Sequence, residues 1–170
     1  MKRLMILTAL LTAVLSLTAF GAENAGAVPS VNGALHVEGT GLFDSAGQRV
    51  QLRGVSTHGV QWYPQYVNEG TFRELRDKWN MNAVRLAMYT AEGGWCEADN
   101  VKRSGFRELL AQGIEAARAA DVYAILDWHI LSDGDPNTHL EEAKAFFAYY
   151  SERYRDADHI LYEICNEPNG

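Results

Sequence analysis

Glu167 is the residue of this sequence best placed to act as a general acid or base. It stands in the run Asn166-Glu167-Pro168, directly after an apolar segment with the pattern of a β-strand. Hydrolysis by general acid–base catalysis commonly uses two carboxyl groups, one to protonate the leaving group and one to attack or to activate water. No second carboxylate has an equally clear position in the sequence. The alternative interpretation is that Asn166 and Pro168 only form a turn at the end of the strand.

Aromatic and polar side chains also end or follow the three other segments that have the pattern of a strand. Aromatic rings pack against the C–H faces of a pyranose, while polar neighbours bind its hydroxyl groups. The members of this set are His58, Gln61, Trp62, Tyr63, Arg85, Tyr89, Asp127, Trp128 and His129. Together with Glu167, they predict a carbohydrate-binding site.

Several of these residues also have a purely structural interpretation. Arg85 could pair with Glu163 or Asp127, and His129 could be a buried histidine whose ring nitrogens are satisfied. Asp127 and His129 could also be metal ligands, but two ligands at this spacing are weak support for a metal site. We therefore predict no metal site and no cofactor.

The elements that would position these residues alternate along the chain. Apolar runs predict strands at 50–56, 82–88, 122–127 and 160–165, and helical spacing of apolar residues predicts helices between them, most clearly over 100–120. Capping boxes are expected at Thr71 and Glu74 in the first helix and at Thr138 and Glu141 in the third. The apolar faces expected to be buried are Phe72, Leu75 and Trp79; Phe106, Leu109, Leu110, Gly113, Ile114 and Ala117; and Leu140, Ala143, Phe147, Tyr150 and Tyr154.

The order β-α-β-α-β-α-β predicts a parallel sheet with right-handed connections. Both an open doubly wound sheet and part of a (β/α)8 barrel fit this order, although no glycine-rich phosphate turn follows the first strand to support a dinucleotide-binding sheet. A complete barrel needs about 250 residues, so the 170 residues would hold about half of one. A small β-hairpin is expected ahead of the sheet, between residues 34 and 55.

Composition and the N-terminal segment predict a soluble protein that is exported. Hydrophobic residues make up 47% of the chain and charged residues 22%, and the net charge of −7 without a visible basic patch argues against binding to duplex nucleic acid. Lys2 and Arg3 precede an uncharged apolar run over 4–20, and Ala25-Gly26-Ala27 offers a cleavage site. This order predicts a signal peptide over residues 1–27. The alternative is a membrane anchor, but the run is shorter than the roughly 20 residues of a spanning helix.

Export to an oxidising compartment would permit a disulfide between Cys96 and Cys165, which are the only cysteines. Because Cys165 lies in an apolar run, we predict that it is a packed thiol and is not bonded to Cys96.

The motifs resemble the clan A glycoside hydrolases, and among them glycoside hydrolase family 5. Asn166-Glu167-Pro168 resembles the acid/base signature of the clan. The longer runs are most similar to the bacterial secreted endo-β-1,4-glucanases, and they cover nearly all of the chain after residue 27. These runs are 52–63, 85–89, 127–133, 135–138 and 162–170. Cys165 departs from the pattern, in which a small residue, often alanine, is expected.

The resemblance implies a (β/α)8 TIM barrel and a retaining endo-β-1,4-glucanase that hydrolyses internal bonds of cellulose and related glucans. Glu167 would be the proton donor and later the base, Asn166 would bind the sugar 2-hydroxyl, and Arg85 would hold the nucleophilic carboxylate. His58, Trp62, Tyr63, Tyr89 and His129 would line the substrate-binding subsites and the cleavage point. A β-mannanase or xyloglucanase of the same clan, or a non-catalytic glucan-binding fragment, are the alternatives.

In the family, the nucleophilic glutamate ends the seventh barrel strand, and residues 28–170 contain no counterpart. We therefore expect residues 28–170 to be the N-terminal half of a catalytic domain, with little or no hydrolytic activity when alone. The complete protein is expected to be a secreted, extracellular monomer that is not bound to a membrane after signal cleavage. Its expected partner is a β-glucan such as cellulose or a cello-oligosaccharide, and not a nucleic acid.

Overall fold

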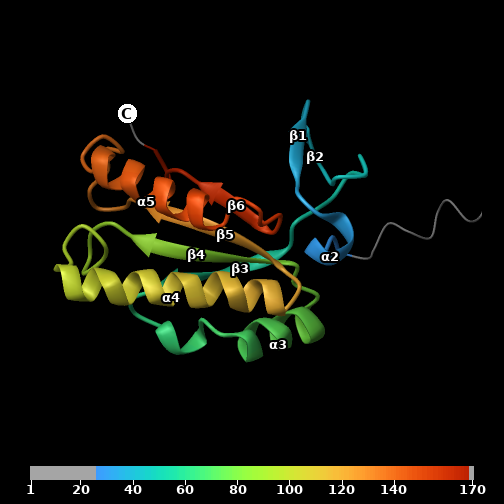
Figure 1. Cartoon of the computed structure of the whole chain (residues 1–170), viewed down its shortest axis with the longest axis horizontal. Helices are drawn as coiled ribbons and strands as arrows, with labels where there is room; N and C mark the ends of the chain where they lie inside the picture. The colour runs from blue at the N-terminus through green and yellow to red at the C-terminus, as the bar shows by residue number, and fades with distance from the viewer. Residues whose placement is uncertain (1–25, 169–170) are drawn as a thin grey trace, which may run out of the picture.

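A four-stranded parallel sheet forms the centre of the computed structural model, which describes residues 26–168 (Figure 1). Its strands are β3 (Gly54–Gly59), β4 (Ala83–Tyr89), β5 (Tyr123–His129) and β6 (Ile160–Glu163). They lie side by side in the order of the sequence, and all three pairings are parallel. The predicted α/β fold with a parallel sheet is confirmed.

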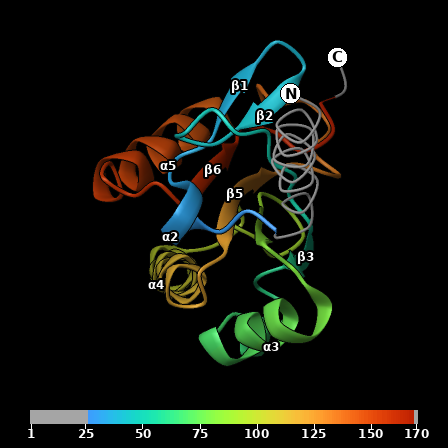
Figure 2. The same cartoon turned by 90° about the vertical axis from the view of Figure 1, so that its right-hand side faces the viewer.

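One helix connects each strand to the next, and the three helices lie on the same side of the sheet (Figure 2). They are α3 (Glu69–Trp79), α4 (Asn100–Ala119) and α5 (Leu140–Arg153), and a short 3-10 helix, η1 (Pro64–Tyr66), precedes α3. Helices outside and parallel strands inside are the two layers of a (β/α)8 barrel.

The predicted N-terminal hairpin is also present. After the short helix α2 (Pro29–Asn32), strands β1 (His36–Glu38) and β2 (Gly41–Phe43) pair antiparallel. The turn after β2 is held by Asp44, whose carboxylate accepts hydrogen bonds from the backbone N–H groups of Ala46 at 3.0 Å and Gln48 at 2.8 Å. An aspartate that bonds to N–H groups further along the backbone is a common way to fix such a turn.

The alternation of side chains along β4 and β5 decides which residues form the core and which remain for the site. Successive side chains of a strand point to opposite faces. In β4, Leu86 and Met88 are fully buried in the main apolar cluster with residues of α4, and in β5 Leu126 and Trp128 join the same cluster. The residues between them belong to the other face of the sheet, and they include the predicted site residues of these strands: Arg85, Tyr89, Asp127 and His129.

Both predicted capping boxes are wrong, because the helices begin at other residues. Asn68 caps α3, and its side-chain oxygen accepts from the backbone N–H of Thr71 at 2.9 Å, which places Thr71 inside the first turn. Asparagine is among the strongest N-cap residues. Helix α5 begins after His139, which makes no side-chain capping bond, whereas Thr138 lies in the preceding turn and donates its N–H to the carbonyl of Asp135.

Two of the predicted helix faces also need correction. Trp79 ends α3 and is 76% exposed, whereas Phe72 and Leu75 pack as expected. In α5, Leu140 lies in the first turn and is exposed, and the buried face is centred on Phe146, which contacts the rings of Trp95, Trp128 and Tyr150. The predicted face of α4 is confirmed, with Leu109 only partly buried.

The first strand differs most from its predicted boundaries, whereas the boundaries of the other three all lie within two residues of the prediction. The first strand begins at Gly54 and not at residue 50, and the fourth ends at Glu163 and not at residue 165. The Cys96 and Cys165 thiols are free, and Cys165 packs against the core, as predicted.

The predicted signal peptide lies outside the described residues, apart from Gly26 and Ala27. Within residues 26–168, no helix has the length and apolar character that crossing a membrane requires.

Candidate active site

The predicted site residues come together at the carboxyl ends of the parallel strands. The register pairs Tyr89 with His129, Ala87 with Asp127, and Asp127 in turn with Glu163 on the next strand. Because these neighbours have the same orientation in the pleat, their side chains share one face of the sheet. The carboxyl end of a parallel sheet is also where α/β barrels and open α/β sheets carry their active sites.

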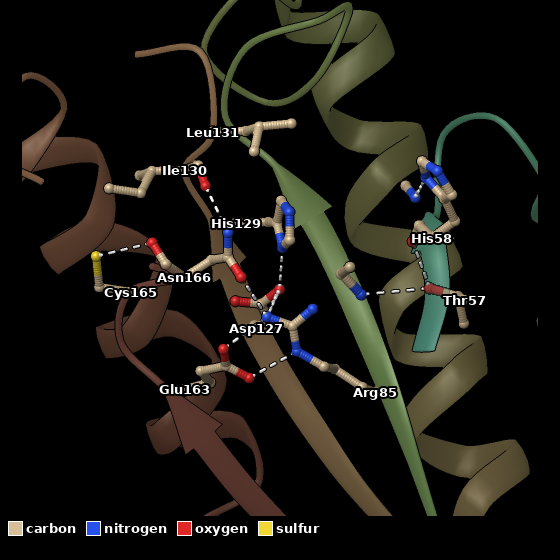
Figure 3. A network of polar contacts seen from close by, with 12 residues as sticks. Thr57, His58, Arg85, Asp127, His129, Ile130, Leu131, Glu163, Cys165 and Asn166 are labelled. Atoms are coloured by element: carbon tan, nitrogen blue, oxygen red, sulfur yellow. Dashed lines mark hydrogen bonds and ion pairs between the residues drawn. The ribbon is translucent and has the colours of Figure 1, made fainter. Parts of the chain in front are cut away.

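Arg85 is the centre of a polar network on this face (Figure 3). Its Nε and Nη2 donate to the two carboxylate oxygens of Glu163 at 2.7 and 2.6 Å. Nη2 also lies 2.9 Å from Oδ2 of Asp127 and donates to Oδ1 of Asn166 at 3.0 Å. The structural alternative for Arg85 is therefore confirmed for both acids, since it pairs with Glu163 and with Asp127. A bidentate pair of this kind fixes the plane of the guanidinium group.

The charges of this network shift the pKa values of its members. The hydrogen bonds to Glu163 are the main cause that raises the pKa of Arg85, against an opposing effect of burial. Burial raises the pKa of Asp127, which has no solvent-exposed surface, although the bond to His129 and the charge of Arg85 act in the opposite direction. The surroundings thus favour the charged form of Arg85 and disfavour the charged form of Asp127.

His129 is held on two sides. Its Nδ1 lies 2.7 Å from Oδ2 of Asp127, and its ring stacks on that of Tyr89 with a centroid distance of 4.0 Å and an interplanar angle of 25°. Only 7% of the residue is exposed. His129 is therefore a buried histidine whose Nδ1 has a hydrogen-bond partner, as the structural interpretation expected. It remains part of the candidate site because it lies at the carboxyl end of β5.

The aromatic residues predicted to bind substrate continue outward from His129 as one cluster. The ring of Tyr89 lies 4.8 Å from that of Trp62 and 6.0 Å from that of His58, and Tyr63 contacts the edge of His58 at 6.2 Å. Trp62 and Tyr63 are 40% and 48% exposed, whereas Tyr89 is buried. The cluster therefore runs from the interior to an open aromatic surface, as a carbohydrate site requires.

His58, near the end of β3, has an unusual backbone conformation. Its φ of +56° lies in the left-handed region, and its Nδ1 accepts from the N–H of the next residue, Gly59, at 2.9 Å. Positive φ in a histidine is uncommon, and such residues concentrate at functional sites.

Asn166 and Glu167 follow β6 and differ sharply in exposure. Asn166 is buried, donates from Nδ2 to the carbonyl of Ile130 at 2.9 Å, and receives the bond from Arg85. Glu167 is exposed and has a φ of +39°. Burial is the main cause that raises the pKa of Tyr89, and the negative charge of Glu167 is among those that add to it, so Glu167 lies within electrostatic range of the aromatic cluster.

The importance of Glu163 and Asp127 was underestimated from the sequence. Glu163 was considered only as a possible partner of Arg85, and the bond from Asp127 to His129 was not predicted. The signal was Arg85 itself, because a lone arginine inside an apolar strand requires buried counter-charges. The bond from the Thr90 hydroxyl to Asp133 at 2.6 Å, behind the site, was not predicted.

A hollow of the described residues lies elsewhere. It has a volume of about 460 Å³ and is lined by α2, the ends of α4 and α5, and the segment before β6, which places it at the amino ends of the strands. Its lining has mixed charge, and Asp121 there is already bonded to Ser30. We assign the site to the opposite end, where the aromatic cluster and Glu167 are. Within residues 26–168, no group of three or more metal-ligating side chains is arranged to bind a metal ion.

Sequence comparison connects this site with known proteins. Residues 43–170 match the cellulase family, described as glycosyl hydrolase family 5. Endoglucanase A of Butyrivibrio fibrisolvens is 45% identical over 139 residues, which are 81% of this chain and 32% of that protein. An endoglucanase of Clostridium saccharobutylicum is 43% identical over 161 residues, 95% of this chain and 35% of that protein. The chain spans about a third of the length of these relatives.

Structural comparison gives the same result. The catalytic domain of the Thermobifida fusca endoglucanase Cel5A matches with a TM-score of 0.77 and 41% identity, over 85% of this chain and 46% of that one. A second structure of that domain, with the same similarity to this chain, is a complex with cellotetraose. The four strands and three helices described above therefore correspond to part of a glycoside hydrolase barrel.

Proposed function

The chain belongs to glycosyl hydrolase family 5, the cellulase family, and from this premise we propose that it provides part of the active site of a retaining endo-β-1,4-glucanase. The observation that carries the proposal is the position of Glu167, an exposed carboxylate that follows the end of β6 and lies within electrostatic range of an aromatic cluster that opens to solvent. A glycosidic oxygen bound on this cluster would lie within reach of an acid.

In the proposed reaction, Glu167 protonates the leaving oxygen while a second carboxylate attacks the anomeric carbon. Glu167 then acts as the base that activates water to hydrolyse the glycosyl-enzyme. Asp127 and Glu163, the acids on the same face, are both engaged by Arg85. We therefore propose that the nucleophile comes from outside residues 26–168. The described contacts of Arg85 use Nε and Nη2, and the same guanidinium group is proposed to hold the nucleophile.

The proposed substrate is a β-1,4-glucan, cellulose or a cello-oligosaccharide. Support comes from the cellotetraose bound to the related Thermobifida fusca domain. The proposed contacts are stacking of sugar rings on Trp62 and Tyr63, and hydrogen bonds from the hydroxyl groups to His58, Tyr89, His129 and Asn166. No step of this scheme needs a cofactor.

The acid/base role is tested by comparing Glu167→Gln with Glu163→Gln in the full-length protein. Glutamine keeps the shape of the side chain but cannot transfer the proton. On cellulose, Glu167→Gln should lower kcat/KM by about 10²–10⁴-fold. On an aryl cellobioside with an activated leaving group the loss should be smaller, because the first step no longer needs an acid. The covalent intermediate should then accumulate, and added azide should release it.

Glu163→Gln is the matched control, since it removes a carboxylate of the same network that holds Arg85 and is not proposed to transfer a proton. It should lower activity on both substrates to a similar degree and should not respond to azide. An equal loss on both substrates in Glu167→Gln, without rescue by azide, would exclude Glu167 as the acid/base. Faster hydrolysis of mannan or xyloglucan than of cellulose would contradict the proposed substrate.

We also propose that the protein acts outside the cell after removal of residues 1–27. N-terminal sequencing of the secreted protein should give Val28 as the first residue. A membrane-bound product that still begins at Met1 would contradict this.

A further inference from the structure

We propose that Asp127 is a positioning residue for His129, fixing the ring so that Nδ1 carries the proton and Nε2 faces the substrate as a hydrogen-bond acceptor. The inference rests on the proposed function, in which His129 contacts the sugar. It assigns to the Asp127–His129 pair a role distinct from that of the Arg85–Glu163 pair beside it.

The first support is the way Asp127 uses its two oxygens. Oδ2 takes both contacts, with Nδ1 of His129 at 2.7 Å and with Nη2 of Arg85 at 2.9 Å. Oδ1 is buried and has no hydrogen-bond partner among residues 26–168. Burial of a carboxylate with one orphan oxygen is unfavourable. A carboxylate retained only to pair Arg85 would be redundant, because Glu163 already binds that arginine with both of its oxygens.

The second support is the geometry of the His129 ring. The bond to Asp127 fixes one edge of the imidazole, and the stacking on Tyr89 fixes its face. A carboxylate can only accept, so the neutral imidazole must donate from Nδ1, and Nε2 then has a lone pair and no proton. This arrangement makes His129 an acceptor for a sugar hydroxyl. The opposite tautomer would present an N–H to the same hydroxyl and would lose the bond to Asp127.

The third support is that the two acids of the network can be separated experimentally. Asp127 and Glu163 both contact Arg85, but of the two only Asp127 is bonded to His129. If Asp127 is removed, Arg85 still has both oxygens of Glu163 and the amide oxygen of Asn166. Loss of Asp127 should therefore affect His129 more than it affects the arginine.

The test is ¹⁵N NMR of the full-length protein labelled at histidine, at about pH 8, where ordinary imidazoles are neutral. The signals of His129 are assigned by their absence in His129→Gln. In the wild type, Nδ1 should have the shift of a protonated nitrogen and Nε2 that of an unprotonated one. Asp127→Asn should largely keep this pattern, because the amide oxygen can take the place of Oδ2 while the NH2 group takes the place of the orphan Oδ1. Asp127→Ala should lose it.

Glu163→Gln is the control variant, and it should leave the shifts of His129 unchanged. In kinetics on cello-oligosaccharides, Asp127→Ala should lower kcat/KM by roughly 10²-fold, the size of effect that loss of fixed geometry at a reacting centre produces, and Asp127→Asn by less. Because asparagine has the same shape as aspartate, a role in packing alone would give the same order of activities, and the tautomer of His129 is the measurement that separates the two roles.

Three results would overturn the inference: an Nε2–H tautomer in the wild type, an unchanged tautomer in a folded Asp127→Ala, or an equal change in Glu163→Gln. The first needs no substitution of Asp127, so a failure of Asp127→Ala to fold leaves the test decisive. Absence of β-glucan hydrolysis by the wild type would instead refute the proposed function, and the NMR result distinguishes that outcome from failure of the Asp127–His129 assignment.

Discussion

The two central strands and the two outer strands of the sheet are built differently. In β4 and β5, six of the seven residues are buried, and the two strands pair in continuous register from Ala83 with Tyr123 to Tyr89 with His129. In β3 most residues are exposed, and its register with β4 shifts between Ser56 and Gly59. No residue of the four-residue strand β6 is fully buried.

The residues of the candidate site show the same division between central and outer strands. Arg85, Tyr89, Asp127 and His129 belong to the central strands, where packing and hydrogen bonds fix them. Trp62, Tyr63 and Glu167 follow the outer strands and are exposed. The central strands thus supply the fixed groups of the site, and the segments after the outer strands supply the groups that a polysaccharide can reach. Preorganised groups need a rigid scaffold, whereas a long polymer needs open access.

The largest effect of this difference should appear when residues 28–170 are expressed alone. Strands β3 and β6 then present unpaired backbone edges, and Val55 and Ile164 are 48% and 74% exposed. Such edges promote association with other chains. We expect this segment to aggregate or to remain partly molten, with binding of a hydrophobic dye and no cooperative thermal transition.

Lysine substitutions at the edges provide the control. Val55→Lys places a charge on β3 and Ile164→Lys places one directly after β6, and both should reduce aggregation, as measured by size-exclusion chromatography and light scattering. A sharp cooperative transition in a monomeric sample of the unsubstituted segment would show that the outer strands are as well stabilised as the central ones.

The next largest effect is the loss of stability expected from a substitution in a central strand. Leu126 of β5 is completely buried in the main apolar cluster. Leu126→Ala should reduce the free energy of unfolding of the full-length protein by about 2–5 kcal/mol, because it removes buried methyl groups and leaves a cavity. Val101→Ala on α4, where the side chain is 83% exposed, should change it by less than about 0.5 kcal/mol. Denaturant unfolding measures both, and a loss below about 1 kcal/mol for Leu126→Ala would contradict the contrast between strands.

The same contrast explains how much of the fold the sequence predicted. The central strands were predicted almost to their ends, because long apolar runs buried on both sides leave a strong pattern. The first strand, predicted over 50–56, lies instead at Gly54–Gly59, since an exposed strand has little apolar periodicity to read. The fourth strand begins at Ile160 as predicted and ends at Glu163, two residues early. The start of α4 at Asn100 was predicted correctly, whereas the predicted cap of α3 was wrong for a local reason. Asn68 is also a strong N-cap residue, and a four-residue pattern cannot decide between it and Thr71.

For the candidate site, the sequence predicted which side chains lie together and which acids pair with Arg85, but not how Asp127 is shared. His58, Trp62, Tyr63, Tyr89 and His129 form one aromatic cluster, as their positions at strand ends suggested. The sharing of one oxygen of Asp127 between Arg85 and His129 could not be predicted. It depends on the register between β4, β5 and β6, and register is a property of the folded sheet.

The smallest predicted effect concerns pH and the buried charge of Asp127 in the full-length protein. Burial is the main cause that raises the pKa of Asp127 above its ordinary value near 3.8, and the negative charge of Glu163 adds to it. The folded state therefore holds this proton to a higher pH than the unfolded state does, and between those two pKa values the stability that Asp127 contributes falls as the pH rises.

An asparagine has no such proton. The stability of Asp127→Asn relative to the wild type should thus increase as the pH rises through the acid range, and urea unfolding of both proteins from about pH 3 to about pH 7 measures the difference. A difference that is constant or that decreases with pH would mean that the bonds from His129 and Arg85 outweigh burial. Asp127 would then be an ordinary ion-pair partner, and its charged form between the central strands would not reduce the stability of the folded state.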